Sequence, residues 1–201
     1  EQSNPELADK LELLFMAHPD ASAFWVATGD TRGRERSRRM FIEGARWADD
    51  TKGSIFDRPT WHTARWPIVS KDAPEEAKAA ASARRGQPAG QAIEALVMNY
   101  AMLSSADTNP SERASALAWL LHLVGDIHQP LHVSDQYSKE FPAGNGAGTL
   151  EYVMDPIGGI PMPLHLLWDS NIYRLTALDA VEEDAAALVQ KYPRSAFPEL
   201  K

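Results

Sequence analysis

The feature that most constrains the fold is a long helical pattern that follows Asn109-Pro110 and runs through SERASALAWLLHLVGDI. The pattern ends at Gln129-Pro130, because proline cannot continue a helix. Its second half is apolar on almost every face, which is typical of a helix buried among other elements. The chain must therefore supply further elements to surround this helix.

The remaining apolar periodicity and the turn residues predict mostly helices. The first helix begins near Pro5 and ends at His18-Pro19-Asp20, and seven others are expected at 21–27, 33–50, 75–85, 90–106, 110–127, 163–175 and 178–191. Residues 53–74 are expected to be an irregular connection. Residues 134–162 are expected to be a long Gly- and Pro-rich loop with at most a short hairpin, in which only 150–153 is typical of a strand. The predicted fold class is all-α, with one domain over residues 1–201.

Composition excludes several kinds of site. The chain has no cysteine, so any zinc must be held by His, Asp, Glu or a chain terminus. Its formal net charge of −8 argues against broad electrostatic attraction to a polyanion. A phosphate substrate would therefore need a local source of positive charge, which bound metal ions could supply. Since no apolar run approaches the roughly 18 residues of a membrane span, no such span is expected. No signal peptide is visible in the polar N-terminus.

Two His–Asp pairs are the strongest candidates for chemistry. His122 and Asp126 are four residues apart, on one face of the apolar helix, and His165 and Asp169 repeat the spacing between apolar flanks. Burying such a pair costs several kcal/mol unless it is hydrogen-bonded or binds a cation. A buried His–Asp hydrogen bond explains one pair equally well. Two copies in a chain with six histidines strengthen the metal-binding alternative.

The residues around these pairs carry a resemblance to a known family. HLVGDIHQPLHV at 122–133 and LHLLWD at 164–169, with WAD at 47–49 and WH at 61–62, resemble the zinc-dependent single-strand nucleases of the nuclease S-one and P-one type. The four motifs occur in the family's order, and the similarity covers about half of the chain. The resemblance implies a mostly helical domain with two or three zinc ions in a cleft, a plan that bacterial zinc-dependent phospholipases C share.

The resemblance also implies which residues bind metal. One zinc is surrounded by Asp49, His62, His122 and Asp126, and Asp126 also bridges towards a third ion. Another zinc is held by His132, His165 and Asp169. In the family the third ion is completed by an N-terminal tryptophan and a nearby histidine. This chain begins at Glu1 without them, so we expect that an N-terminal segment is missing.

Two further departures concern substrate rather than metal. Arg65 stands where the family has an acidic residue near the attacking water, and it is a candidate for contacting a substrate phosphate. The family's asparagine-bearing loop here reads GNGAGT, which makes Asn145 and Thr149 candidate substrate contacts. These changes leave open whether activity is retuned or lost.

The function implied is hydrolysis of single-stranded DNA, RNA or nucleotides to 5′-phosphate products by metal-activated water. The alternatives are a phospholipase C type activity, for which no exposed apolar rim is evident in residues 134–162, and a binding protein that keeps its zinc without turnover. The resemblance implies a secreted or periplasmic protein, and a monomer is favoured. His18 is expected to be structural or exposed, and His128 to be structural or to support the metal ligands. Trp47, Trp119 and Trp168 are expected to be core residues.

Overall fold

The computed structural model describes residues 5–84, 87–170 and 178–197. The chain divides into two compact units, Glu1–Ala147 and Gly148–Lys201. The single domain expected over residues 1–201 stays a prediction. Residues 171–175 of the expected helix at 163–175 lie outside the described residues.

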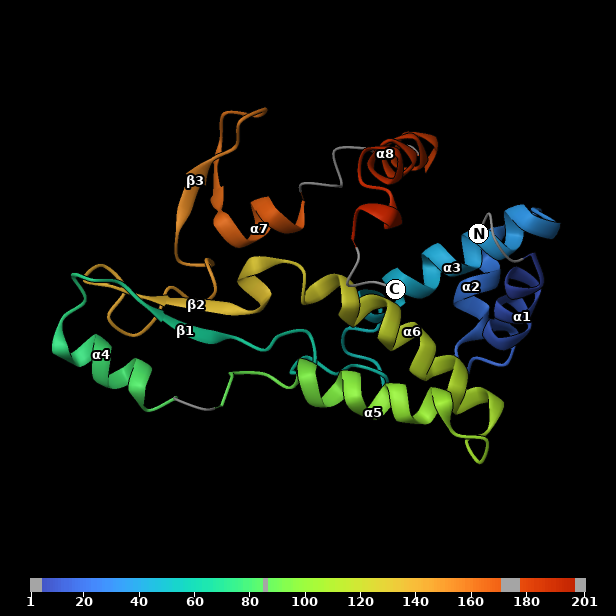
Figure 1. The fold of residues 1–201 in the computed structure, drawn as a ribbon, viewed down its shortest axis with the longest axis horizontal. Coiled ribbons are helices and arrows are strands. Elements are labelled where there is room, and N and C mark those ends of the chain that lie inside the picture. The colour runs from blue at the N-terminus through green and yellow to red at the C-terminus, as the bar shows by residue number, and fades with distance from the viewer. Residues whose placement is uncertain (1–4, 85–86, 171–177, 198–201) are drawn as a thin grey trace. The chain divides into compact units, whose positions relative to one another are not determined.

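The first unit is built from helices. Their bounds are α1 Pro5–Met16, α2 Ala21–Thr28, α3 Gly33–Asp50, α4 Glu75–Ser82, α5 Ala92–Ser104 and α6 Pro110–Asp126. Helix α6 packs against α5, α3 and α1, and α5 and α6 run side by side in Figure 1. The side chain of Asn109 caps α6 by accepting a hydrogen bond from the amide of Glu112. The predicted central helix is thus confirmed, with other helices around it.

The core of this unit is aromatic and lies where α1, α2, α3 and α6 meet. Its largest buried side chains include Phe15, Phe24, Trp47, Trp119 and Leu123. Helices α1 and α3 approach closely at Gly44, where an added Cβ would lie 2.5 Å from the Phe15 ring. The prediction that Trp47 and Trp119 are core residues is confirmed.

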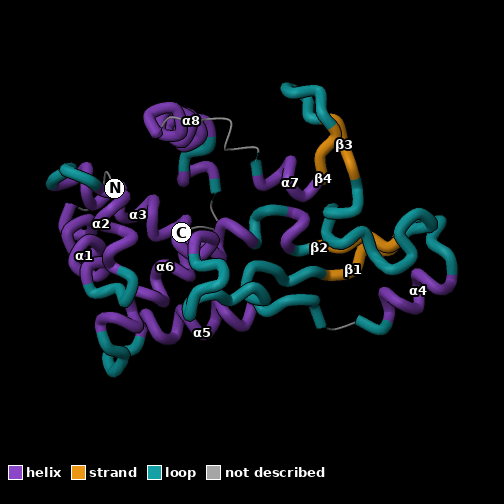
Figure 2. Tube along the Cα trace, turned by 180° about the vertical axis from the view of Figure 1, so that it is seen from behind, coloured by secondary structure: helices purple, strands orange, loops and turns teal. Residues whose placement is uncertain are grey.

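A short parallel strand pair was not expected from the sequence. Strand β1, Trp66–Val69, pairs with β2, Ser134–Tyr137, in the register Trp66↔Ser134 to Val69↔Tyr137 (Figure 2). The prediction that all of 53–74 is irregular is therefore wrong at 66–69. A four-residue strand containing proline has no clear local signal, and its partner lies far along the chain. A 3₁₀ turn, Pro130–His132, leads into β2.

The second unit holds a hairpin and two helices among its described residues. Strands β3, Tyr152–Met154, and β4, Pro161–Pro163, are antiparallel, followed by α7, Leu164–Asp169, α8, Leu178–Lys191, and a 3₁₀ turn at Arg194–Ala196. The short hairpin predicted within 134–162 is confirmed. The all-α class is confirmed as well, since strands are few and short. No helix in the described ranges is long and apolar enough to cross a membrane.

His18 is buried between α1 and α2 and gives the first unit a pH-dependent stability. Its ring packs on Phe24 and Trp47, and its Nδ1 accepts a hydrogen bond from the amide of Asp20. Burial lowers the pKa of His18 to about 4, from about 6.5 in an unfolded chain. The unfolded state therefore takes up a proton at a higher pH than the folded state, so stability is complete above pH 6.5 and falls as the pH approaches 4.

We expect the free energy of unfolding to fall by about 2 kcal/mol between pH 7 and pH 5 because of this histidine. The variant His18→Asn keeps a side-chain acceptor for the amide of Asp20 but cannot titrate. Urea unfolding at the two pH values should show a smaller pH-dependent loss in this variant than in the natural chain. Equal losses in the two proteins would show that His18 does not carry the effect.

Candidate metal centre

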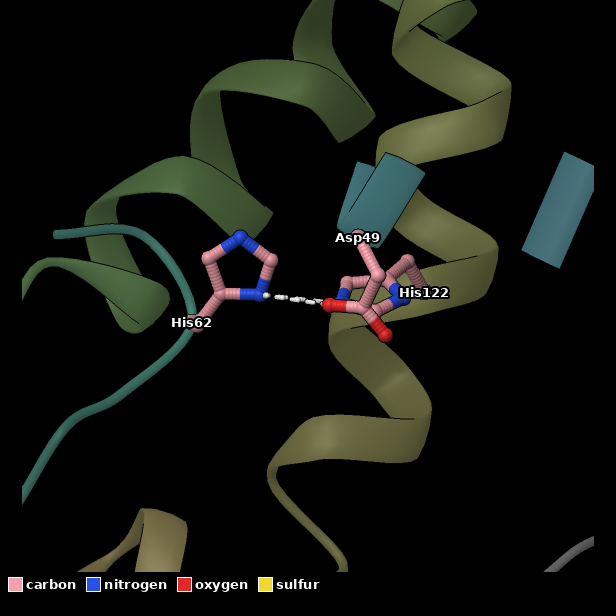
Figure 3. A group of neighbouring side chains, drawn as sticks. All are labelled: Asp49, His62 and His122. Atoms are coloured by element: carbon pink, nitrogen blue, oxygen red, sulfur yellow. Dashed lines mark hydrogen bonds and ion pairs between the residues drawn. The ribbon is translucent and has the colours of Figure 1, made fainter. Parts of the chain in front are cut away.

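Three side chains from distant parts of the sequence converge in the first unit. Asp49 comes from the last turn of α3, His62 from the irregular segment after it, and His122 from α6 (Figure 3). Each offers one ligand atom, and these atoms all lie within 4.8 Å of one another. Oδ1 of Asp49 is 3.4 Å from Nε2 of His122 and 3.7 Å from Nδ1 of His62.

The backbone of α3 fixes which ring nitrogen of neutral His122 carries the proton. Nδ1 of His122 donates to the carbonyl oxygen of Ala45 at 2.9 Å, so in the neutral ring the other nitrogen, Nε2, carries a lone pair. That lone pair points at Nδ1 of His62, 2.9 Å away. A hydrogen bond from the far ring nitrogen to a backbone carbonyl is a common way to orient a metal-binding imidazole.

Asp126, one turn after His122, completes this cluster. Its Oδ2 lies 3.0 Å from Nε2 of His122 and 3.1 Å from Nδ1 of His62. Burial alone would raise the pKa of Asp126, but hydrogen bonds from His122 and His62 and the charges of neighbouring histidines lower it. Burial alone would lower the pKa of His122, but the hydrogen bond and charge of Asp126 raise it. Both pKa shifts favour the charged forms of Asp126 and His122. The carboxylates of this cluster therefore stabilise positive charge beside them.

The other oxygen of Asp126 faces a different histidine. Oδ1 of Asp126 is 3.3 Å from Nδ1 of His132, and the same nitrogen donates to the carbonyl oxygen of His62 at 2.8 Å. The 3₁₀ turn that carries His132 is held in place by the amide of Ala64, which donates to the carbonyl of His132 at 2.9 Å. One carboxylate thus reaches the imidazoles of α6 and of the following turn.

The donor chemistry fits a divalent cation. Two carboxylates and two imidazole nitrogens crowd together, and Nε2 of a neutral His122 has no proton to share with them. Such a cluster is stable only if an imidazole is protonated or a cation takes the place of the protons. Neutral imidazole and carboxylate are ligands that zinc accepts. Asp49, His62, His122 and Asp126 therefore could hold a metal ion.

The position of His62 depends on a close approach of two backbone segments. The amides of Gln91 and Ala92 donate to the carbonyls of Thr60 and Thr63, and Gly90 lies against Thr63 with a φ of +106°. A Cβ at Gly90 would be 2.0 Å from the carbonyl oxygen of Thr63. Only glycine fits there, because of the positive φ and because of the close contact with Thr63.

We expect Gly90→Ala to destabilise the protein by more than about 2 kcal/mol and to weaken metal binding, because the segment carrying His62 must move. Gly53→Ala is the matched control, since Gly53 also has a positive φ (+77°) but an added Cβ there meets nothing within 4 Å. Chemical denaturation and metal titration of both variants measure the two effects. If both variants lose the same stability, the clash with Thr63 plays no part.

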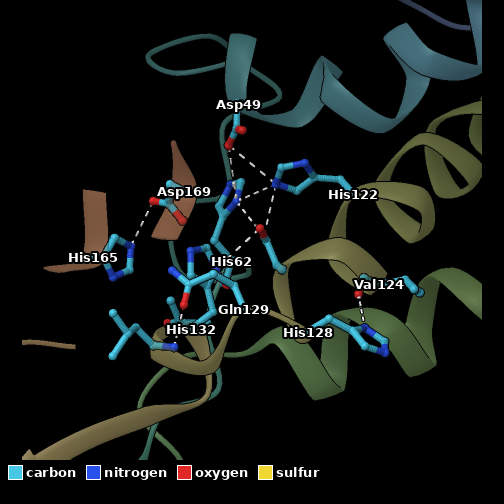
Figure 4. Close-up of polar contacts among 12 residues, drawn as sticks. Asp49, His62, His122, Val124, His128, Gln129, His132, His165 and Asp169 are labelled. Carbon is cyan, nitrogen blue, oxygen red and sulfur yellow. Dashed lines mark hydrogen bonds and ion pairs between the residues drawn. The ribbon is translucent and has the colours of Figure 1, made fainter. Parts of the chain in front are cut away.

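The second set of predicted ligands is divided between the two units. His132 belongs to the first unit, and His165 and Asp169 to the second. Within α7, Nε2 of His165 lies 3.2 Å from Oδ2 of Asp169, so the spacing of four places the two groups together (Figure 4). The joint role of the three residues stays a prediction.

Two of the three candidate substrate contacts, Arg65 and Asn145, lie in hydrogen-bonded backbone. Arg65 pairs through its backbone with Ala89, with hydrogen bonds of 2.8 and 3.0 Å, and its side chain is half-buried. Asn145 is 2% exposed, and its Oδ1 accepts from the amide of Gln136 at 3.1 Å. Thr149 is exposed at the start of the second unit. Substrate binding by these three residues stays a prediction, and the contact of Asn145 shows that it also holds its own loop.

Some residues that support the centre carry no sequence signal. The ring of Trp119 packs on His62 in an edge arrangement, with centroids 5.6 Å apart, and the carbonyl of Ala45 orients His122. His128 lies outside the cluster and contacts the carbonyl of Val124 at 2.6 Å (Figure 4). Its structural or supporting role stays a prediction. The core position predicted for Trp168 is wrong, since this side chain is 45% exposed on the short helix α7.

The helical fold and the histidine–aspartate cluster define a mainly helical protein with a candidate metal centre. A model of the S1/P1 Nuclease family matches residues 20–199. Nuclease S1 of Aspergillus oryzae is 31% identical over 131 residues, a match that covers 64% of this chain and 40% of that protein. The chain belongs to the S1/P1 nuclease family, as its motifs indicated, and spans less than half the length of the curated relative that it matches.

Proposed function

We propose that this chain is a zinc-dependent phosphodiesterase that hydrolyses single-stranded nucleic acid and nucleotides. The observation that carries the proposal is the convergence of Asp49, His62 and His122, with ligand atoms within 4.8 Å of one another, in a member of a nuclease family. The close contact of Asp126 with both histidines supports it.

The proposed ligands follow the motifs. One zinc is held by Asp49, His62, His122 and Asp126. A second is held by His132, His165 and Asp169, on the evidence of the sequence motifs alone. The bridging role of Asp126 is supported by its two oxygens, which have different histidine partners. The proposal is for two or three zinc ions per chain.

The chemistry needs no side-chain nucleophile. Zinc bound by these groups would supply Lewis acidity, lowering the pKa of water and neutralising charge on phosphate. Water attacks phosphorus, a new P–O bond forms, the bond to the 3′ oxygen breaks, and that oxygen takes a proton, leaving a 5′-phosphate. Asp126 and Asp49 provide the negative charge that holds cations in a protein of net charge −8. Arg65 is proposed to contact the substrate phosphate, and Asn145 and Thr149 the rest of the substrate.

The wider setting belongs to the same proposal. A location outside the cytoplasm, by secretion or in the periplasm, rests on the family resemblance. A monomer is the favoured oligomeric state. The name of the matching relative, a nuclease, supports nucleic acid as substrate.

A phospholipase C type activity is the second candidate, and one observation favours it. The β3–β4 hairpin exposes a row of large apolar side chains, each 60% or more exposed: Leu150, Tyr152, Met154, Ile157 and Ile160. Its tight turn is fixed by Asp155, whose carboxylate accepts from the amides of Ile157 and Gly158. An exposed apolar surface of this kind is what a lipid substrate would contact. It was not evident from the sequence.

An assay with three substrates separates these candidates and the third alternative, a zinc-binding protein without turnover. Purified, zinc-loaded protein is incubated with single-stranded DNA, a 3′-nucleotide and a phosphocholine lipid. We expect hydrolysis of the first two and none of the lipid. Turnover of the lipid alone would favour the phospholipase, and full zinc occupancy without turnover of any of the three would favour the binding protein.

A further inference from the structure

A separate pocket in the first unit lies beside the metal centre, behind the indole of Trp119. It has a volume of about 240 Å³ and is bounded by α5, α6, the end of α3 and the segment around Trp61. Four aromatic side chains line it: Trp47, Phe56, Trp61 and Trp119. None of the predicted metal ligands does. The volume is below the roughly 300 Å³ at which pockets for drug-sized ligands begin, so it suits a single ring system.

The aromatic walls suit a flat ligand. The rings of Trp61 and Trp119 are 4.8 Å apart and nearly perpendicular, and Phe56 packs on Trp47 at 5.5 Å. The guanidinium of Arg58 lies over the Trp61 ring, 5.8 Å from its centroid, at the edge of the pocket. Stacking on such side chains contributes about 1–3 kcal/mol for each nucleobase. Met98 and Met102 add flexible apolar surface.

One buried amide gives the pocket a polar recognition group. Asn99 is 3% exposed and lines the pocket from α5. Its Nδ2 donates to the carbonyl oxygen of Ala95 at 2.8 Å, while no residue in the described part of the chain donates to its Oδ1. An asparagine side chain also presents a donor and an acceptor side by side, the pattern that pairs with an adenine edge.

We propose that this pocket binds a nucleobase, stacked against Trp61 and paired with the amide of Asn99. The choice of a nucleobase rests on the proposed function. Trp119 separates the pocket from the metal centre, its ring centroid lying 5.6 Å from that of His62 and 6.3 Å from that of His122. A base held here would lie on the other side of Trp119 from the metal ligands, and the pocket would position a nucleic acid chain relative to them.

The test is binding of adenosine, which has no phosphate for the metal centre to bind. Calorimetric titration of the natural chain, with and without zinc, should show one adenosine per protein. Asn99→Leu, which is branched at the same carbon, removes the amide, and Met102→Trp fills the pocket. We expect Asn99→Leu to weaken binding at least about 10-fold, or about 1.4 kcal/mol, and Met102→Trp to abolish it. Tyr100→Ala, on an exposed face of the same helix, should bind as the natural chain does.

Zinc content and the melting temperature show whether each variant is folded. If folded Asn99→Leu and Met102→Trp both bind adenosine as tightly as the natural chain, the proposal is wrong, and so it is if the natural chain binds none. Adenosine binding that depends on Asn99 in a protein that hydrolyses no phosphoester would uphold the pocket and refute the proposed function. If the protein hydrolyses DNA, binds no adenosine and is not inhibited by it, the proposed function is upheld and the pocket proposal is refuted. An oligonucleotide with abasic positions, binding as tightly as its normal counterpart, would show that free nucleosides are the ligand.

Discussion

The substitution Asp126→Ala is expected to abolish turnover, reducing hydrolysis of single-stranded DNA at least about 1000-fold, and to lower the zinc content of the protein. The reason is that this one carboxylate contacts three imidazoles, through Oδ2 with His62 and His122 and through Oδ1 with His132. Its removal takes away a proposed ligand of the first zinc and the proposed bridge to another. Elemental analysis and a DNA hydrolysis assay measure the two losses.

Asp50→Ala is the matched control for this change. Asp50 is also an acidic residue in the first unit, but it is exposed and pairs with Arg46 on the surface of α3. Its loss should leave zinc content and turnover within about twofold of the natural chain, since exposed ion pairs contribute little. If Asp126→Ala retains its full zinc content, the bridging role assigned to Asp126 is wrong.

Removal of zinc by a chelator is expected to eliminate turnover and to lower the melting temperature by about 5–10 °C. An ion present at a hundredfold excess over its Kd stabilises the folded state by about 2.7 kcal/mol, and each kcal/mol shifts the melting temperature of a chain of this size by roughly 2–4 °C. The stabilisation would arise because a bound cation separates the carboxylates and imidazole lone pairs around His122. Differential scanning calorimetry with and without chelator provides the measurement, and adding zinc back should restore both properties.

The variant His122→Ala shows whether the shift comes from this centre. It lacks one of the four converging groups, so the chelator should lower its melting temperature by clearly less than that of the natural chain. A chelator effect of the same size in both proteins would mean that the stabilising metal is bound elsewhere.

Much of the fold could be predicted because its signals are local. Helix α6 begins at Pro110, after the cap Asn109, and ends before Gln129-Pro130, and helix α3 has the predicted bounds Gly33–Asp50. The strand Trp66–Val69 could not, because its stability comes from a partner at Ser134–Tyr137 rather than from its own residues. The exposure of Trp168 was missed for a related reason. The apolar residues of a helix only six residues long do not show what that helix packs against.

The candidate centre also contains both side chains that could be predicted from the sequence and groups that could not. The spacing of His122 and Asp126 on one helix was sufficient to predict that they lie together, and the family motifs added Asp49 and His62, which the structure brings to them. The groups that orient these side chains are backbone carbonyls, such as that of Ala45, and any residue type supplies a carbonyl. The constraint at Gly90 is equally hidden, because the segment it approaches is distant in sequence.

The most direct test of the central claim is the zinc content of the natural chain, measured by elemental analysis after loading and extensive dialysis. The convergence of carboxylates and imidazoles around His122 predicts one bound zinc ion, and the sequence motifs predict one or two more per chain. At least one should be lost in Asp126→Ala. A folded chain that retains no zinc would contradict the account, because the cluster would then be held together by protons alone.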